Sequence, residues 1–204
     1  MSRTIDYYFS TVSPWAFMGY ATFLDVVKRH GVHVDFRPVG LGNLFAETGG
    51  TALPKRHPAR QRYRLVELQR WSEARGLDFH VQPAHWPFNG GVTDRLILAA
   101  IRDGHDVAPL IARFGSAVWQ RQEDLGDPAQ IRAILDELSL PASLLEAADT
   151  PEMAAAYEAN HARAVEADVF GSPAYVLDGE VFWGQDRIDL LDAALSSGRP
   201  PFKP

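Results

Sequence analysis

Short runs of alternating or continuous apolar residues stand at both ends of the chain, and such runs are typical of β-strands. Near the N-terminus, this pattern predicts a strand over residues 5–10, a helix over 14–30 and a second strand over 32–39. Two strands joined through a helix normally pair in parallel. Near the C-terminus, Asp178-Gly179 separates two further strand-like runs, and this dipeptide is a strong hairpin signal. We therefore expect a βαβ unit at the start of the chain and a hairpin near its end.

Between these ends, apolar residues recur every three or four positions, which is the spacing of amphipathic helices. We expect Thr93 to cap one of these helices, Trp119 to lie in the core and residues 46–58 to form a loop. A closing helix should begin at Asp186. Short connections favour packing of the helices as a bundle. The expected central helices cover residues 59–75, 94–102, 107–122, 128–138, 142–148 and 151–167.

The composition restricts the possible functions. The 204 residues are 46% hydrophobic and 23% charged, which is ordinary for a folded chain with a sizeable core. A formal net charge of −6 argues against nucleic acid as a general partner. We expect a cytoplasmic protein, because we find no signal-peptide pattern and no membrane span. The chain has no cysteine, so it cannot exchange disulfides itself, and any sulfur chemistry must come from a bound thiol.

The first expected strand runs into Ser13-Pro14, a pair suited to open a helix. A serine hydroxyl at the N-cap accepts a backbone N–H of the first turn, and proline at the first helical position presets φ. The helix N-terminus then presents N–H groups to an anion. An ordinary helix cap is the simple interpretation of Ser13, and a catalytic hydroxyl is the alternative. Far downstream, Gly171-Ser172-Pro173 leads into an apolar strand, and a cis Ser172-Pro173 bond is compatible with this pattern.

A basic run extends from Lys55 to Arg75. Most charge runs are solvated helix faces, and we assign the arginines beyond Arg56 to such a face. Lys55 and Arg56 stand at the end of the expected loop and have a second interpretation as a carboxylate-binding pair, since the planar guanidinium pairs well with a carboxylate. Asp186 likewise has two interpretations, as a carboxylate favoured by the helix dipole or as a ligand-binding group. The scattered histidines do not complete a metal-ligand set, so we expect no metal.

Residues 9–14, 169–173 and 182–187 together resemble the 2-hydroxychromene-2-carboxylate isomerases. These enzymes are relatives of the kappa-class glutathione transferases within the DsbA-like thioredoxin superfamily, and the resemblance covers nearly the whole chain. It implies glutathione as the cofactor, a small aromatic molecule as the substrate and a homodimer as the assembly. It also implies a particular fold.

The implied fold is α/β, with a thioredoxin-like domain that carries an inserted all-helical domain. The thioredoxin-like domain would comprise residues 1–45 and 165–204, and the inserted domain residues 46–164. This division agrees with the element order expected above.

The resemblance also implies roles for single residues. Ser13 would lie beside the glutathione sulfur and be the catalytic residue. Asp186 would meet the glutathione amine, and a set of neighbouring residues would hold the rest of the tripeptide. Substrate would be held by Lys55, Arg56 and Trp86. The implied glutathione-binding set is Ser13, Ser172, Pro173, Trp183, Gly184, Gln185 and Asp186.

The implied reaction is a cis–trans isomerisation in aromatic catabolism, between a 2-hydroxychromene-2-carboxylate and a hydroxybenzylidenepyruvate. A thiolate would add to the conjugated alkene, the resulting single bond would rotate, and the sulfur would leave. One departure from the family concerns the substrate, because Phe45 stands where the isomerases have a lysine, and Lys55 is a candidate to replace it. Two alternatives stay open: kappa-like glutathione transfer to an electrophile, and a cysteine-free thioredoxin-like binding module.

Overall fold

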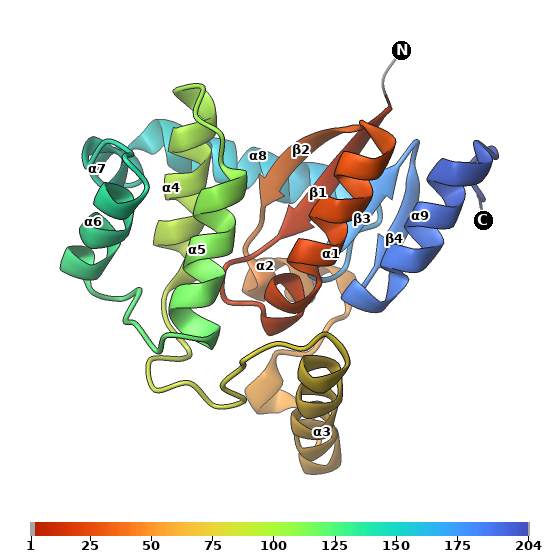
Figure 1. The fold of residues 1–204 in the computed structure, drawn as a ribbon, viewed down its shortest axis with the longest axis horizontal. Helices are drawn as coiled ribbons and strands as arrows, with labels where there is room; N and C mark the ends of the chain where they lie inside the picture. Colours follow the sequence, from red (N-terminus) through yellow and green to blue (C-terminus); the bar gives the residue numbers. More distant parts are fainter. Residues whose placement is uncertain (1–2, 204) are drawn as a thin grey trace.

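A four-stranded sheet lies at the centre of the computed structural model, which describes residues 3–203 (Figure 1). The strand order is β2-β1-β3-β4. β1 (Thr4–Phe9) pairs in parallel with β2 (His33–Pro38), as the sequence predicts, and antiparallel with β3 (Ala174–Leu177). β4 (Glu180–Trp183) pairs antiparallel with β3 and completes the hairpin. Residues from the two ends of the chain therefore share one sheet.

Both faces of the sheet are covered by helices. Because successive side chains of a strand point to opposite faces, Tyr7 and Tyr8 of β1 belong to two different hydrophobic clusters. The first cluster includes residues of α1 (Pro14–His30) and α9 (Ile188–Ser197), which lie in front of the sheet in Figure 1. The second includes Leu44 and Ala164, from α2 (Leu41–Thr48) and α8 (Pro151–Glu166) behind it.

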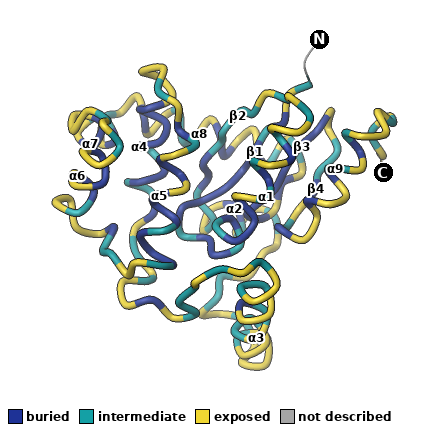
Figure 2. The backbone as a smooth tube through the Cα atoms, in the orientation of Figure 1, coloured by how far each residue is buried: buried dark blue, intermediate teal, exposed yellow. Residues whose placement is uncertain are grey.

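The remaining helices stand between β2 and β3 in sequence. α4 (Gly90–Arg102) packs against α8 and β2, and α5 (Ala108–Trp119) packs against α1. α6 (Pro128–Glu137) contacts α5 and α7 (Ser143–Ala147) contacts α4, so this pair lies farther from the sheet. Trp119 at the end of α5 is fully buried, as expected. α3 (Pro58–Ala74) lies apart from these helices and is mostly exposed, with Leu68 as its buried residue (Figure 2).

Three local predictions are wrong. The expected loop over residues 46–58 contains the end of α2, which Gly49 terminates in the left-handed conformation and which is held in place by the fully buried Leu44. The α4 helix begins at Gly90 and is capped by Asn89, whose side chain accepts the Gly91 N–H, whereas Thr93 lies inside the helix. The last helix begins with the short turn η2 (Gln185–Arg187) before α9.

Within residues 3–203, no helix combines the length and apolar character that a membrane crossing requires. The same residues contain no cluster of three or more side chains suited to hold a metal ion. The first hydrophobic cluster runs from the sheet into α4, α5, α6 and α7, so the helical insertion shares its core with the sheet. The domain boundaries at residues 45 and 165 and the homodimer stay predictions.

Candidate active site

Ser13 caps α1 at the point where β1 ends. Its Oγ accepts the backbone N–H of Ala16 at 3.2 Å, and Pro14 occupies the first helical turn, as the sequence predicts. The same Oγ donates to the backbone carbonyl of Ser172, with 3.4 Å between the two oxygens. Only 4% of Ser13 is exposed. The serine is thus both a helix cap and a buried link to the second sequence stretch.

Ser172 and Pro173 reach this turn from the other end of the chain. The Ser172-Pro173 bond is cis, in agreement with the sequence pattern. The Ser172 Oγ accepts the Ser10 N–H at 3.2 Å. The Pro173 carbonyl accepts the N–H of Gly184 at 2.9 Å, and Gly184 has φ of 106°, a conformation that favours glycine. The two segments singled out from the sequence therefore meet.

A cleft of about 290 Å³ opens beside this junction. Ser172, Gly184, Gln185 and Asp186 line it, and the half-exposed Trp183 forms a wall. Ser13 and Pro173 are buried and do not line the cleft. The remaining lining residues are Trp15, Arg56, Glu67, Trp71 and Arg187.

Two groups in the cleft differ in their freedom to bind a ligand. The Asp186 carboxylate is exposed and pairs with its neighbour Arg187 at 2.8 Å. The Gln185 side chain is buried and held by Arg75 at the end of α3: Arg75 Nε donates to Gln185 Oε1 at 2.8 Å, and Nη2 donates to the Gln185 carbonyl at 3.0 Å. Arg75 also donates to Thr22 Oγ1 of α1. Arg75, which we assigned to a solvated face, is therefore a structural part of the site.

A buried carboxylate that sequence analysis missed lies behind the Ser13 turn. Asp94 of α4 is fully buried and accepts the Ser10 hydroxyl at 2.9 Å, the Thr11 N–H at 2.9 Å, the Thr11 hydroxyl at 2.8 Å and the Tyr157 hydroxyl at 2.8 Å. Burial raises the pKa of the Asp94 carboxyl to about 6, against the lowering effect of these hydrogen bonds. The available signal was a charged residue between the apolar positions of an amphipathic helix.

The chain is similar to known proteins over nearly its whole length. The protein-family model of the DSBA-like thioredoxin domain matches residues 4–196. The chain belongs to this family. The 2-hydroxychromene-2-carboxylate isomerase of Sphingobium xenophagum is 25% identical over 198 residues, covering 96% of this chain and 99% of that protein. Glutathione S-transferase kappa 1 of Homo sapiens is 23% identical over 210 residues, covering 94% and 90%.

A solved structure of a 2-hydroxychromene-2-carboxylate isomerase superposes on this DSBA-like chain with a TM-score of 0.81 at 22% identity, covering 95% of each chain. The comparisons confirm the resemblance inferred from the sequence and the thioredoxin-like fold with a helical insertion. They do not assign roles to single residues, so the site residues stay predictions.

The three expected substrate residues of this DSBA-like chain lie in different surroundings. Lys55 is exposed at the end of the turn η1 (Leu53–Lys55) and does not line the cleft. Arg56 lines it, and its guanidinium carbon lies 5.9 Å from the centroid of the Phe45 ring. Arg56, rather than Lys55, thus brings a positive charge to the cleft beside Phe45.

Trp86 lies on the segment that joins α3 to α4. Its Nε1 donates to the carbonyl of Val12 at 3.0 Å, which places the indole against the turn that carries Ser13. The guanidinium carbon of Arg64, from α3, lies 5.1 Å from the centroid of the indole ring. Trp86 and Arg64 therefore face each other across the space between α3 and this segment.

Proposed function

We propose that the protein is a glutathione-dependent cis–trans isomerase that acts on an aromatic ene-one acid, of the type of 2-hydroxychromene-2-carboxylate and hydroxybenzylidenepyruvate. The observation that carries the proposal is that Ser172 and the segment 183–187 line one cleft, while the Ser13 hydroxyl donates to the backbone carbonyl of Ser172. The similarity to 2-hydroxychromene-2-carboxylate isomerases extends over nearly the full length of both chains. The absence of cysteine supports the use of a bound thiol.

The donor set of the cleft fits glutathione. The exposed Asp186 carboxylate suits the ammonium group of the γ-glutamyl end. The immobilised turn that follows Gly184 would offer backbone N–H groups to its carboxylate, and the segment before Pro173 would offer backbone groups to the cysteinyl peptide. The cleft volume of about 290 Å³ lies at the lower end of the range for small-molecule sites. When bound, glutathione supplies a thiolate that adds reversibly to a conjugated alkene, which allows rotation about the former double bond.

The residues of the chain would assist this reaction electrostatically. The N-terminus of α1 has no acidic residue in its first turn, so its positive dipole end favours a thiolate over a thiol. The Ser13 hydroxyl adds a donor, because its bond to the Ser172 carbonyl is long at 3.4 Å and can be exchanged for a shorter one. Arg56 would hold the carboxylate of the substrate and stabilise negative charge that develops on its carbonyl oxygen.

Kappa-like glutathione transfer is the second candidate function, and Phe45 favours it, because the family lysine is absent there. The missing lysine does not exclude an isomerase, because Arg56 lies beside Phe45 and a guanidinium can hold a substrate carboxylate as well as an ammonium group can. The amount of thiol after turnover separates the two reactions. An isomerase returns all the glutathione, whereas a transferase accumulates a stable conjugate that mass spectrometry detects.

The first experiment is a calorimetric titration of glutathione into the wild type and Asp186→Ala. We expect micromolar to millimolar binding that Asp186→Ala weakens about tenfold, the effect of losing a hydrogen bond to a charged group. Asp189→Ala is the matched control, because Asp189 is an exposed carboxylate of α9 that does not line the cleft. Absence of glutathione binding would overturn both enzyme candidates and favour a cysteine-free binding module.

Ser13→Ala tests the catalytic assignment. In the presence of glutathione, we expect slow isomerisation with glutathione affinity nearly unchanged, because the hydroxyl acts on the sulfur and not on the tripeptide backbone. Isomerisation that proceeds equally well without any thiol would contradict the proposal.

The proposal includes action in the cytoplasm, where the thiol pool is kept reduced. It also includes a homodimer, which sedimentation equilibrium would test.

A further inference from the structure

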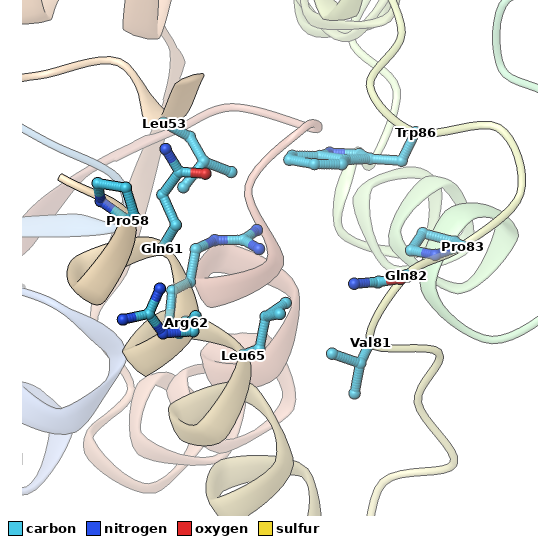
Figure 3. Close-up of a pocket in the computed structure, with 10 residues that line it drawn as sticks. Leu53, Pro58, Gln61, Arg62, Leu65, Val81, Gln82, Pro83 and Trp86 are labelled. Carbon is cyan, nitrogen blue, oxygen red and sulfur yellow. The ribbon is translucent and has the colours of Figure 1, made fainter. Parts of the chain in front are cut away.

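Two larger cavities adjoin the glutathione cleft along α3. The first, of about 510 Å³, shares Trp15, Arg56 and Glu67 with the cleft. The second, of about 500 Å³, lies between α3 and the segment of residues 81–86, and it shares Arg64 with the first (Figure 3). We call them the middle and the outer cavity. The three spaces form a row that begins at the cleft and ends at Trp86.

The described arginines that line the middle and outer cavities contact aromatic rings and backbone but no carboxylate. Among residues 3–203, no ion pair to a carboxylate joins the arginines that line them. The one carboxylate in their walls, Glu67, accepts a hydrogen bond from Arg70 at 2.6 Å. The positive potential of these cavities is therefore not cancelled locally, although the whole chain carries a net charge of −6. The lining arginines are Arg56, Arg60, Arg62 and Arg64.

The positive charges of these arginines also repel one another. Burial, and after it the charge of Arg56, lowers the pKa of Arg64 to about 10. Burial and the charge of Arg60 lower the pKa of Arg56 in the same way. Partly buried cations held together without counter-ions cost stability unless an anion binds between them. The arrangement is thus typical of an anion-binding site with room for more than one negative group.

The outer cavity is also suited to a ring. Leu53, Leu65 and Val81 give it apolar walls, and Trp86 extends its indole across the cavity toward Leu53 (Figure 3). The hydrogen bond from Trp86 to the Val12 carbonyl connects this wall to the Ser13 turn. A ligand that reaches from the turn into the outer cavity would therefore meet Arg56 first, then an aromatic surface and Arg64.

We propose that the substrate is an aromatic dianion, with one anionic group at Arg56 near the glutathione cleft and a second at Arg64 in the outer cavity. The assignment of an ene-one acid to the end of the substrate at Arg56 rests on the proposed function. The second anion site at Arg64 of α3 does not depend on that function. The second anionic group is a carboxylate or sulfonate carried by the ring that packs on Trp86. A mono-anionic ene-one acid would leave Arg64 without an anionic partner and would bind more weakly.

Two probes of matched shape test this inference without glutathione: cinnamate, with one carboxylate, and 4-carboxycinnamate, with two. We expect the wild type to bind 4-carboxycinnamate at least tenfold more tightly, with a steeper loss of affinity as salt is added. Arg64→Gln should lower the affinity for the dianion to about that for cinnamate, with a much smaller effect on cinnamate, which carries no second anionic group. Arg64→Lys, which keeps the charge, should retain part of the preference.

Lys28→Gln is the control for the loss of one positive charge. Lys28 is exposed near the end of α1, about 22 Å along the helix from Ser13. Equal affinities for the two probes in the wild type, no binding of either probe, or a preference that survives Arg64→Gln would each overturn the inference. If the protein binds glutathione but does not prefer the dianion, this inference is wrong and the proposed function still stands. A dianion preference without glutathione binding rejects the proposed function and leaves the anion site established.

Discussion

The buried Asp94 carboxylate should make the stability of this protein depend on pH. Its pKa changes from an ordinary 3.8 to about 6 on folding, because burial disfavours the charged form. Between these two pH values the folded state holds a proton that the unfolded chain has lost, so the free energy of unfolding falls as pH rises. The difference corresponds to about 3 kcal/mol, which is lost between about pH 4 and pH 6 and stays lost above.

Asp94→Asn isolates this effect. Asparagine keeps the volume of the side chain, its Oδ1 can still accept the Thr11 N–H, and its amide can donate to the hydroxyls of Ser10 and Tyr157, which rotate. It therefore resembles the protonated acid at every pH. Relative to the wild type, we expect the variant to gain about 3 kcal/mol between about pH 4 and pH 7. Urea unfolding at several pH values measures the difference, in which the contributions of all other groups cancel.

Parallel stability profiles of the two proteins would refute this reasoning, as would a difference that changes in the opposite direction. Asp189→Asn is the control, because it removes an exposed carboxylate from α9. Its profile should parallel that of the wild type. A profile like that of Asp94→Asn would show that loss of any negative charge, and not burial, produces the effect.

Two further predictions concern packing around the site. Arg75→Ala should weaken glutathione binding about tenfold, because it frees Gln185 from two hydrogen bonds; calorimetry measures the loss, and an unchanged affinity would contradict a role in holding the cleft. Leu44→Ala should destabilise the protein by about 2–5 kcal/mol in urea unfolding, because its side chain is fully buried beneath α2; Phe45→Ala, at a partly buried position of the same helix, should cost less, and equal losses would contradict this account of α2.

The sequence was sufficient to predict structural features that depend only on residues close together in the chain. The dipeptide Ser13-Pro14 was enough to predict the N-cap of α1, and Asp178-Gly179 was enough to predict the β3–β4 hairpin. The meeting of the Ser13 turn with Ser172 followed from the family resemblance and not from spacing. Local patterns failed for α2, because a short helix between glycines is stabilised mainly by Leu44 packing against the rest of the protein.

Arg75 and Asp94 could not be assigned for a related reason. Their partners lie far away in sequence: Gln185 is 110 residues from Arg75, and Ser10 is 84 residues from Asp94. An arginine within a basic run and an aspartate within an amphipathic helix both have ordinary solvated interpretations. Only the folded chain shows that each satisfies buried polar groups of a distant segment.

These distant contacts also explain how a DSBA-like fold can serve a chain without cysteine. If the reacting sulfur arrives on a ligand, the protein needs no nucleophile of its own, but it must hold hydrogen-bond donors where the sulfur will lie. Asp94 holds Ser10 and Thr11, and Ser10 in turn donates to Ser172. The turn that carries Ser13 is thereby fixed from two sides before any ligand binds. Such preorganisation means that no reordering of the turn has to accompany thiolate formation.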